Sequence, residues 1–394
     1  MPRKPPTPIA YGRHEITAAD VRAVLRVLRG QPLTCGPAVE AFEQAIKDAT
    51  GARHAVAVSN GTSALRLLYQ ACGIGPGVRV GVPAITFVAT ASQALLLGAE
   101  VVLLDVDPDT LVLTPAILER CRERLDVVVP VHLAGRLCDM AGLAEVARRR
   151  GAYLLEDGAH AFGSAWSDGR RCGDGTWSRG AIFSFHPVKS VTTGEGGAVA
   201  TNDAAVAAAI RRLRHHGIVR EGFSGDLAAA DGGAPWYHEF HAPATNERLS
   251  DLHAALGVSQ IARLAAITRA RQRVHDAYHR RLADVPWLRL PPPAAGQRPC
   301  WHLFAAQVDW KALGRDRRSF FAAAAAAGIH PQVHYIPLHH QPALKQATRA
   351  DALAGADAAY RGLVSLPCYP GLGRAELGRV DAFVRGVAVG TGRA

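Results

Sequence analysis

The residues with the clearest potential for chemistry lie between Phe183 and Gly197, in the segment Phe-Ser-Phe-His-Pro-Val-Lys-Ser-Val-Thr-Thr-Gly-Glu-Gly-Gly. Lys189 stands here between a predicted strand and a glycine-rich turn, among apolar and hydroxyl residues. An exposed loop lysine would be the ordinary interpretation, because lysine is rarely buried. Lysine is scarce in this chain, however, and a lysine held away from water has a lowered pKa. Its neutral amine can then attack a carbonyl carbon and form a Schiff base.

A second candidate is Asp157, in the segment Leu-Leu-Glu-Asp-Gly-Ala-His. It ends an apolar run, and α/β sheets place their sites at the ends of such strands. Taken alone, the residue could equally cap a helix. A lysine and an acid are together what pyridoxal phosphate requires. The lysine binds its aldehyde carbon, and the acid keeps its ring nitrogen protonated so that the ring accepts electrons.

A third candidate is the turn Ser-Asn-Gly-Thr-Ser, which contains Gly61, Thr62 and Ser63 between a predicted strand and a predicted helix. Such residues offer N–H groups and hydroxyls to a phosphate, although they also form ordinary helix caps. The turn lacks the lysine of a P-loop, and no G-x-G-x-x-G follows the first strand, so neither of those nucleotide sites is indicated. Phe87 could stack on a ring or belong to the core.

These candidates lie within a regular alternation of predicted helices and strands. Amphipathic helices are expected at 17–29, capped by Thr17, and at 38–49; the first carries an apolar stripe of Val21, Val24, Leu25 and Leu28. Strands are then expected at 54–59, 78–82, 101–105, 127–131 and 153–156, and helices at 62–72, 89–97, 115–124 and 143–150. Short strands that are apolar on both faces indicate a mostly parallel sheet between helices.

The pattern changes after Glu156. Strands 181–185 and 197–201 are expected to form a closely connected pair, residues 221–235 a mobile loop, and residues 250–282 one long helix. Strands at 302–308 and 332–335 and helices at 317–327 and 374–385 complete the chain. The predicted fold class is therefore α/β, with an N-terminal segment (1–16) near the small domain, a large domain (17–260) and a smaller C-terminal α/β domain (261–394).

Composition narrows the classes of function. With 394 residues, 48% of them hydrophobic, the chain can bury a sizeable core. No apolar run is long enough to span a membrane, no signal peptide is visible, and the seven cysteines are scattered, so a cytoplasmic protein is expected. The net charge of +11 comes without a long basic run, so a nucleic-acid partner is not indicated, and an anionic substrate fits equally well. No metal site is expected, because no H-E-x-x-H is present.

The order of these features resembles, over nearly the whole chain, the vitamin-B6-dependent DegT/StrS-type nucleotide-sugar aminotransferases. The segment 183–197 is the most specific match, and similar motifs stand at 34–37, 246–257 and 332–339. The segments that most resemble the pseudaminic-acid branch of this family are 186–190, 213–220 and 235–239.

The resemblance implies an aminotransferase of fold type I with pyridoxal phosphate as its cofactor. Lys189 would carry the cofactor and shuttle protons, and Asp157 would pair with the ring nitrogen. His160 would lie near the phenolic oxygen, and Phe87 would stack on the ring. The phosphate would be held by Gly61, Thr62, Ser63 and Ser184, and by Asn246 of the neighbouring subunit in a homodimer. The nucleotide-sugar pocket would be lined by Tyr11, Gln31, Pro32, Leu33, Thr34, His186, Gln332, Val333, His334 and Tyr335.

The implied activity is transfer of an amino group from L-glutamate to C4 of a UDP-linked 4-keto-6-deoxy-N-acetylhexosamine. Arg214 and Arg220 are expected to be available to its diphosphate. One alternative is a keto-sugar of the perosamine or bacillosamine type. Another is 3-dehydratase chemistry, although those relatives carry histidine at the position of Lys189. A third is a non-catalytic regulator that binds the cofactor, but no nucleic-acid-binding module is visible.

The chain departs from the family pattern at several positions. Thr245 and Glu247 flank Asn246, where the family usually has aromatic residues. Gly158 replaces the usual alanine, and Cys35 stands where a longer polar residue is common. These differences concern the subunit interface and the choice of sugar rather than the chemistry.

Overall fold

The computed structural model describes residues 7–30 and 32–388. Its central sheet has two parts, joined by a parallel bridge between Val131 and Asp157. One part has five parallel strands in the order β17-β4-β3-β5-β6: Thr348–Arg349, Glu100–Leu104, Arg79–Pro83, Val127–Val128 and Tyr153–Leu154. The other has the order β2-β10-β9-β7: His54–Val58, Gly197–Thr201, Ala181–Ser184 and Glu156–Asp157. Only β10 runs antiparallel to its neighbours, so the expectation of a mostly parallel sheet is confirmed.

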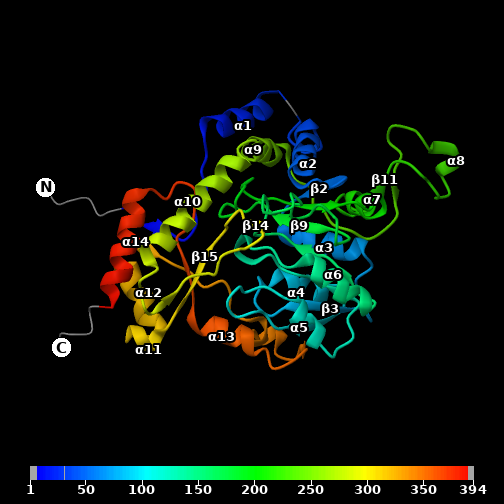
Figure 1. The fold of residues 1–394 in the computed structure, drawn as a ribbon. Helices are drawn as coiled ribbons and strands as arrows, with labels where there is room; N and C mark the ends of the chain where they lie inside the picture. The colour runs from blue at the N-terminus through cyan, green and yellow to red at the C-terminus, as the bar shows by residue number, and fades with distance from the viewer. Residues whose placement is uncertain (1–6, 31, 389–394) are drawn as a thin grey trace.

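Helices cover this sheet, as the alternating pattern predicted (Figure 1). They are α2 (Pro37–Thr50), α3 (Gly61–Ala71), α4 (Ala89–Leu96), α5 (Pro115–Arg120), α6 (Met140–Arg149) and α7 (Ala204–Leu213). Local signals start several of them: the side chains of Asn60, Thr114 and Asp139 each accept a hydrogen bond from a backbone N–H in the first turn. The strands β2, β3 and β4 are almost fully buried, which explains their continuous apolar sequences.

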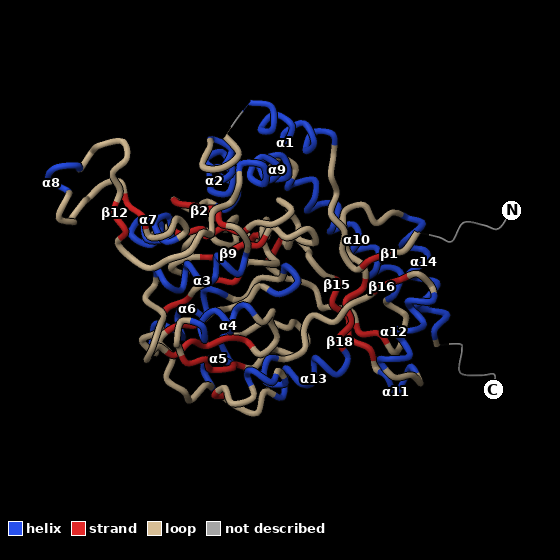
Figure 2. Tube along the Cα trace, turned by 180° about the vertical axis from the view of Figure 1, so that it is seen from behind, coloured by secondary structure: helices blue, strands red, loops and turns tan. Residues whose placement is uncertain are grey.

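A smaller unit contains the sheet β13-β15-β18, made of Leu288–Arg289, Phe304–Val308 and Leu363–Leu366. Helices α11 (Trp310–Leu313), α12 (Arg317–Ala326) and α14 (Arg374–Val387) lie together at one end of the molecule in both views (Figures 1 and 2). The N-terminal strand β1 (Ile9–Ala10) pairs with β16 (Ile329–His330) of the same region. The segment with β17 and α13 (Ala354–Gly362) packs on the large core instead. The division at residue 260 stays a prediction.

Two further pairs of short strands lie outside these sheets. Strands β8 (Ala165–Trp166) and β14 (Gln297–Arg298) pair between the two units. Strands β11 (Ile218–Val219) and β12 (Glu239–Phe240) form the base of an arm that carries the short helix α8 (Ala228–Asp231). This arm projects from the body of the protein in both views (Figures 1 and 2). Short 3-10 turns lie at Leu133–Gly135, Leu338–His340 and Pro342–Leu344.

The structure corrects three expectations. The helix predicted at 250–282 is two helices, α9 (Asp251–Ile261) and α10 (Leu264–Leu282), separated where the Arg263 guanidinium binds Asp20 and the Glu15 carbonyl. Residues 332–335 form no strand; only Gln332 pairs, with Ser365.

The third correction concerns α1 (Ala18–Gly30). Its small residue Ala23 and its Val27 are buried, whereas Val21, Leu25 and Leu28 of the predicted stripe are exposed. The helix packs on α9 through its narrow face. Its larger apolar face therefore remains open to solvent in the single chain.

Candidate active site

A cavity of about 670 Å³ lies where the two parts of the central sheet meet. All of the predicted cofactor residues except Asn246 line it: Gly61, Thr62, Ser63, Phe87, Asp157, His160, Ser184 and Lys189. Four of the predicted substrate residues line it as well: Tyr11, His186, His334 and Tyr335. Segments far apart in the sequence thus converge, because β2, β9 and β7 run in the same direction within one part of the sheet and their carboxyl ends lie at one edge.

Lys189 follows β9 in a tight turn, and its N–H donates to the carbonyl oxygen of His186 at 2.9 Å. Gly194 in the next turn has φ +84°, a conformation that favours glycine. Burial lowers the pKa of the Lys189 ammonium to about 8; the Asp157 carboxylate opposes this change and the Arg271 guanidinium adds to it. About a tenth of the amine is therefore neutral at pH 7, far more than for an ordinary lysine, and this fraction can attack a carbonyl.

Asp157 ends β7, and the residue is buried, with only 4% of its surface exposed. The Thr90 hydroxyl donates to its Oδ2 at 2.7 Å, and the Ala159 N–H donates to its Oδ1 at 3.0 Å. Burial raises the pKa of this carboxyl group, although the two hydrogen bonds and the nearby Lys189 act in the opposite direction. The carboxylate is held in one orientation, aimed at the cavity that Lys189 also lines.

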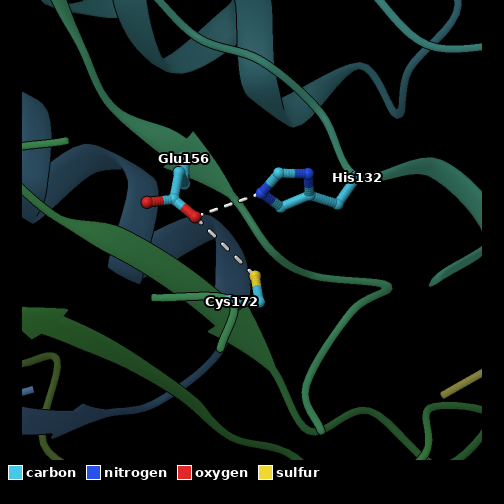
Figure 3. Close-up of side chains that lie close together, drawn as sticks. All are labelled: His132, Glu156 and Cys172. Atoms are coloured by element: carbon cyan, nitrogen blue, oxygen red, sulfur yellow. Dashed lines mark hydrogen bonds and ion pairs between the residues drawn. The ribbon is translucent and has the colours of Figure 1, made fainter. Parts of the chain in front are cut away.

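A buried network lies behind this acid and anchors the strand that carries it (Figure 3). The His132 Nε2 faces the Glu156 Oε2 at 3.1 Å, and the Cys172 thiol faces the same oxygen at 3.9 Å. The Cys138 N–H donates to the His132 Nδ1, so Nε2 carries a proton and can donate to the Glu156 carboxylate. Although these three side chains are of metal-ligating types and their ligand atoms lie within 4.8 Å of one another, their hydrogen bonds already link β7 to two loops. The absence of a metal stays a prediction.

His160 is fixed as a neutral donor at the cavity wall. The Ala134 N–H donates to its Nδ1 at 3.3 Å, which leaves the proton on Nε2, 3.1 Å from the Tyr335 hydroxyl. Burial is the main cause that lowers the pKa of His160 well below its ordinary value, and the nearby Lys189 acts in the same direction. The ring can therefore donate a hydrogen bond to an oxygen in the cavity without carrying charge.

The phosphate turn has the expected architecture with one difference. Helix α3 begins at Gly61, where a Cβ would come within 2.9 Å of the Ser184 Cβ, so glycine permits the close approach of turn and strand. The N–H groups of Gly61 and Thr62 have no partner within the helix and are available to an anion, while the Ser63 N–H donates to the Asn60 side chain. The Ser63 hydroxyl, however, is hydrogen bonded to the buried Glu247 carboxylate and to Ser59. Its contribution to a phosphate is therefore less direct than the sequence predicted.

Phe87 is 53% exposed, which excludes the interpretation that it is a core aromatic. Its ring lines the cavity, with its centroid 5.9 Å from that of Tyr335. An apolar ring left open at a cavity can stack on a flat ligand.

The predicted substrate residues divide into two groups. The Tyr11 ring lies 5.0 Å from the His334 ring, and both line the cavity with Tyr335 and His186. Gln332 pairs with Ser365, and Val333 packs on the main core. Pro32, Leu33 and Thr34 are exposed and lie outside this cavity, and Gln31 lies outside the described residues. These six positions stay predictions.

Two further expectations can be compared with the geometry. The Arg214 guanidinium is bound to the Glu43 carboxylate and to the Ala57 carbonyl, so the prediction that it is free for a diphosphate is wrong. Asn246 is exposed and lies outside the cavity of its own chain, on a β-bridge with His215. Its oxygen accepts from the Arg248 N–H, and its exposed amide can contact another molecule.

Sequence reasoning missed several residues that shape the site. Thr90 holds Asp157, and Thr86 bonds to Thr90 at 3.0 Å. The His302 ring lies 4.4 Å from that of His160. The one available signal was the pair of threonines, four residues apart and buried at the start of an apolar helix.

The residues present fit pyridoxal phosphate. Asp157 suits a ring nitrogen, Phe87 a ring face, the turn at Gly61 a phosphate and Lys189 an aldehyde carbon. When bound, this cofactor supplies the aldehyde and an electron-accepting ring. The chain supplies a lysine amine of lowered pKa, a buried carboxylate and a neutral imidazole donor. Fold and site together define a pyridoxal-phosphate-dependent transferase of fold type I.

Comparison with known proteins identifies the family. Residues 14–385 match the DegT/DnrJ/EryC1/StrS aminotransferase family, and the chain belongs to it. The protein is therefore a pyridoxal-phosphate-dependent sugar aminotransferase of the kind that acts on nucleotide sugars.

Three solved structures of other proteins are similar to this chain over almost its whole length. Helicobacter pylori PseC, an aminotransferase involved in the biosynthesis of pseudoaminic acid, is 27% identical with a TM-score of 0.88, and 97% of this chain and 100% of that chain are covered. The PLP form of the sugar aminotransferase Spr1654 from Streptococcus pneumoniae is 26% identical with a TM-score of 0.87, covering 97% and 99%. S. venezuelae DesV, in complex with a ketimine intermediate, is 33% identical with a TM-score of 0.83, covering 96% and 95%.

The part of the chain that the structure describes contains no helix that is long and apolar enough to cross a membrane.

Proposed function

We propose that this enzyme transfers an amino group from L-glutamate to C4 of a UDP-linked 4-keto-6-deoxy-N-acetylhexosamine, in the cytoplasm, for a surface sugar of the pseudaminic-acid type. In the nomenclature of that pathway it would be a UDP-4-amino-4,6-dideoxy-N-acetyl-β-L-altrosamine transaminase. The observation that carries the proposal is the cavity in which Lys189, Asp157 and the residues around His186 meet. Two further observations support the choice of sugar. The fold is similar to that of PseC, and the segments 186–190, 213–220 and 235–239 resemble the pseudaminic-acid branch of the family.

The chain's own residues have separate tasks in this reaction. With the cofactor bound, the Lys189 amine would hold its aldehyde carbon and would serve as the base that carries the substrate's proton. The Asp157 carboxylate, held by Thr90, would keep the ring nitrogen protonated. The His160 Nε2–H would donate to the phenolic oxygen. Phe87 would lie against the ring, and the N–H groups of Gly61 and Thr62, with the Ser184 hydroxyl, would hold the phosphate.

The sugar end of the cavity is lined by groups that donate or accept hydrogen bonds. Tyr11, His186 and His334 are suitable for the hydroxyl and acetamido groups of a sugar. Burial lowers the pKa of His334 to about 4, so this ring is neutral, and its Nδ1 lies 2.9 Å from the Ser365 hydroxyl. A pocket that hydrogen-bonds an acetamido group rejects a sugar without one, because its polar groups are left unpaired.

Substrate choice gives the direct test of this proposal. We expect kcat/KM to be at least about tenfold higher for a UDP-4-keto-6-deoxy sugar with a 2-acetamido group than for the same sugar with a 2-hydroxyl group, the loss expected for unpaired buried polar groups. The measurement is a coupled assay with glutamate, in which 2-oxoglutarate is quantified. Equal values, or a preference for the plain sugar, would favour the perosamine-type alternative. Activity with neither sugar, over a panel of UDP-, GDP- and dTDP-linked ketones, would favour a cofactor-binding regulator.

We also propose that the active form is a homodimer with shared sites. Asn246 is exposed and outside its own cavity, as expected for a residue that reaches the phosphate of the partner. The exposed face of α1, with Val21, Leu25 and Leu28, is the kind of apolar patch that a second subunit covers.

Mixed dimers test this arrangement. Lys189→Ala and Asn246→Ala chains, refolded or co-expressed together, should form hybrids in which one site carries neither substitution, and about a quarter of all sites should then be intact. The matched control mixes Lys189→Ala with a chain that carries both substitutions, which creates no intact site. Recovery only in the first mixture supports shared sites; equal activity in both mixtures, or a fully active monomer by light scattering, contradicts them.

A further inference from the structure

The long helix α10 carries an arginine that is almost completely buried. Arg271 is 1% exposed, and it is the largest of the fully buried side chains. Its Nη1 donates to three carbonyl oxygens of the smaller unit: those of Trp301 at 3.1 Å, His302 at 3.2 Å and Cys368 at 3.0 Å. Trp301 and His302 precede β15, and Cys368 follows β18, so one guanidinium nitrogen gathers the ends of both strands.

The other terminal nitrogen of the same guanidinium points to the cofactor lysine. The Arg271 Nη2 lies 3.3 Å from the Lys189 carbonyl oxygen and 3.5 Å from that of Val188. Arg271 therefore bridges the main chain at Lys189 and the strand ends of the smaller unit. It does not line the cavity, so it acts on the site from behind.

This arrangement is physically unusual because the charge has no partner of opposite sign. Within residues 7–30 and 32–388, Arg271 forms no ion pair, and its Nε has no hydrogen-bond partner. Burying a charge is costly unless hydrogen bonds compensate for it. Five carbonyl oxygens provide that compensation here. A lysine ammonium has only three donors at one point, whereas the planar fork of arginine can reach carbonyls on two sides.

We propose that Arg271 is a positioning residue for Lys189, which binds the lysine's main chain to the smaller unit and supplies the positive charge behind the amine. The inference rests on the proposed role of Lys189 as the cofactor-binding lysine. Arg271 contacts neither the cavity nor any substrate group, so its effect is exerted through the placement and the protonation of that lysine.

The electrostatic surroundings of Lys189 support this assignment. The titratable groups that interact with it are Asp157, His160, His302, His334 and Arg271. Burial lowers the pKa of each of the three histidines, so these rings are neutral. The remaining charges are the Asp157 carboxylate, which favours the ammonium, and the Arg271 guanidinium, which opposes it. Removing Arg271 should therefore raise the proton affinity of the nitrogen on Lys189.

The test compares full-length, cofactor-loaded variants. The visible absorption of the bound cofactor is titrated with pH in wild type, Arg271→Gln, Arg271→Lys and Arg281→Gln. Arg281 lies on the same helix, is ion-paired with Asp381 and serves as the control. We expect the Gln variant to shift the titration midpoint upward by about one pH unit, or tenfold in proton affinity, because a nearby positive charge is lost. The control should leave the midpoint unchanged.

The Lys variant separates charge from geometry. It retains the charge, so its midpoint should stay near that of wild type, while kcat should fall about tenfold with little change in KM, since the lysine's main chain is less firmly held. A wild-type midpoint in the Gln variant, or a wild-type kcat in the Lys variant, would overturn the proposal. If circular dichroism shows that the Gln variant does not fold, the Lys variant alone decides. A wild-type protein whose cofactor does not bind Lys189 would instead refute the proposed function.

Discussion

Lys189→Ala is expected to abolish transamination, reducing the rate to that of the uncatalysed background. The physical reason is that, in the proposed function, this amine would both hold the cofactor covalently and carry the proton between two carbon atoms. Burial lowers the pKa of this amine to about 8, so a reactive fraction exists at neutral pH in the native site. The measurement is the formation of 2-oxoglutarate from glutamate, together with the visible spectrum of the bound cofactor.

The other lysines supply the control. Lys311→Ala removes an exposed lysine of the smaller unit and should leave both the rate and the spectrum unchanged. Reduction of the wild-type enzyme with borohydride, followed by peptide mapping, should place the cofactor on Lys189. A label on Lys47 or Lys311 would refute the assignment of this lysine.

Asp157→Asn has the second largest expected effect, a loss of about 10²-fold or more in kcat with the fold retained. An amide carries no negative charge, so it cannot keep the ring nitrogen protonated when the substrate carbon loses its proton. The side chain is nearly the same size; its single oxygen can still accept from the Ala159 N–H, and the Thr90 hydroxyl can accept from its amide nitrogen. Single-turnover kinetics with glutamate isolates the proton-transfer step from product release.

A surface aspartate provides the comparison. Asp168→Asn alters an exposed turn in which the carboxylate binds only Arg170, and its activity should equal that of wild type. If Asp157→Asn retained activity within a few-fold of wild type, Asp157 could not be the partner of the ring nitrogen. Thermal unfolding should show that any loss of activity is not a loss of fold.

Much of the site could be predicted from local sequence because its chemistry depends on strand ends. Lys189 and Gly61 follow apolar strands and Asp157 ends one, and these strands run in the same direction within one sheet, so their carboxyl ends lie at one edge. The alternation of helices and strands also indicated the central sheet, because buried parallel strands have continuous apolar sequences. The resemblance to a known family then connected these features with one cofactor.

The sequence by itself determined which chemical groups this protein has, their order along the chain and the sheet that brings them together. The tertiary structure decided which of those groups are free to act. Arg214 is held by Glu43, Ser63 by Glu247, and the apolar face of α1 is open to solvent. It also brought in Arg271, from a helix more than eighty residues away from Lys189. Such partners are brought together by long-range packing. The periodicities of 2 residues in strands and 3.6 residues in helices describe only local structure, so they do not predict these contacts.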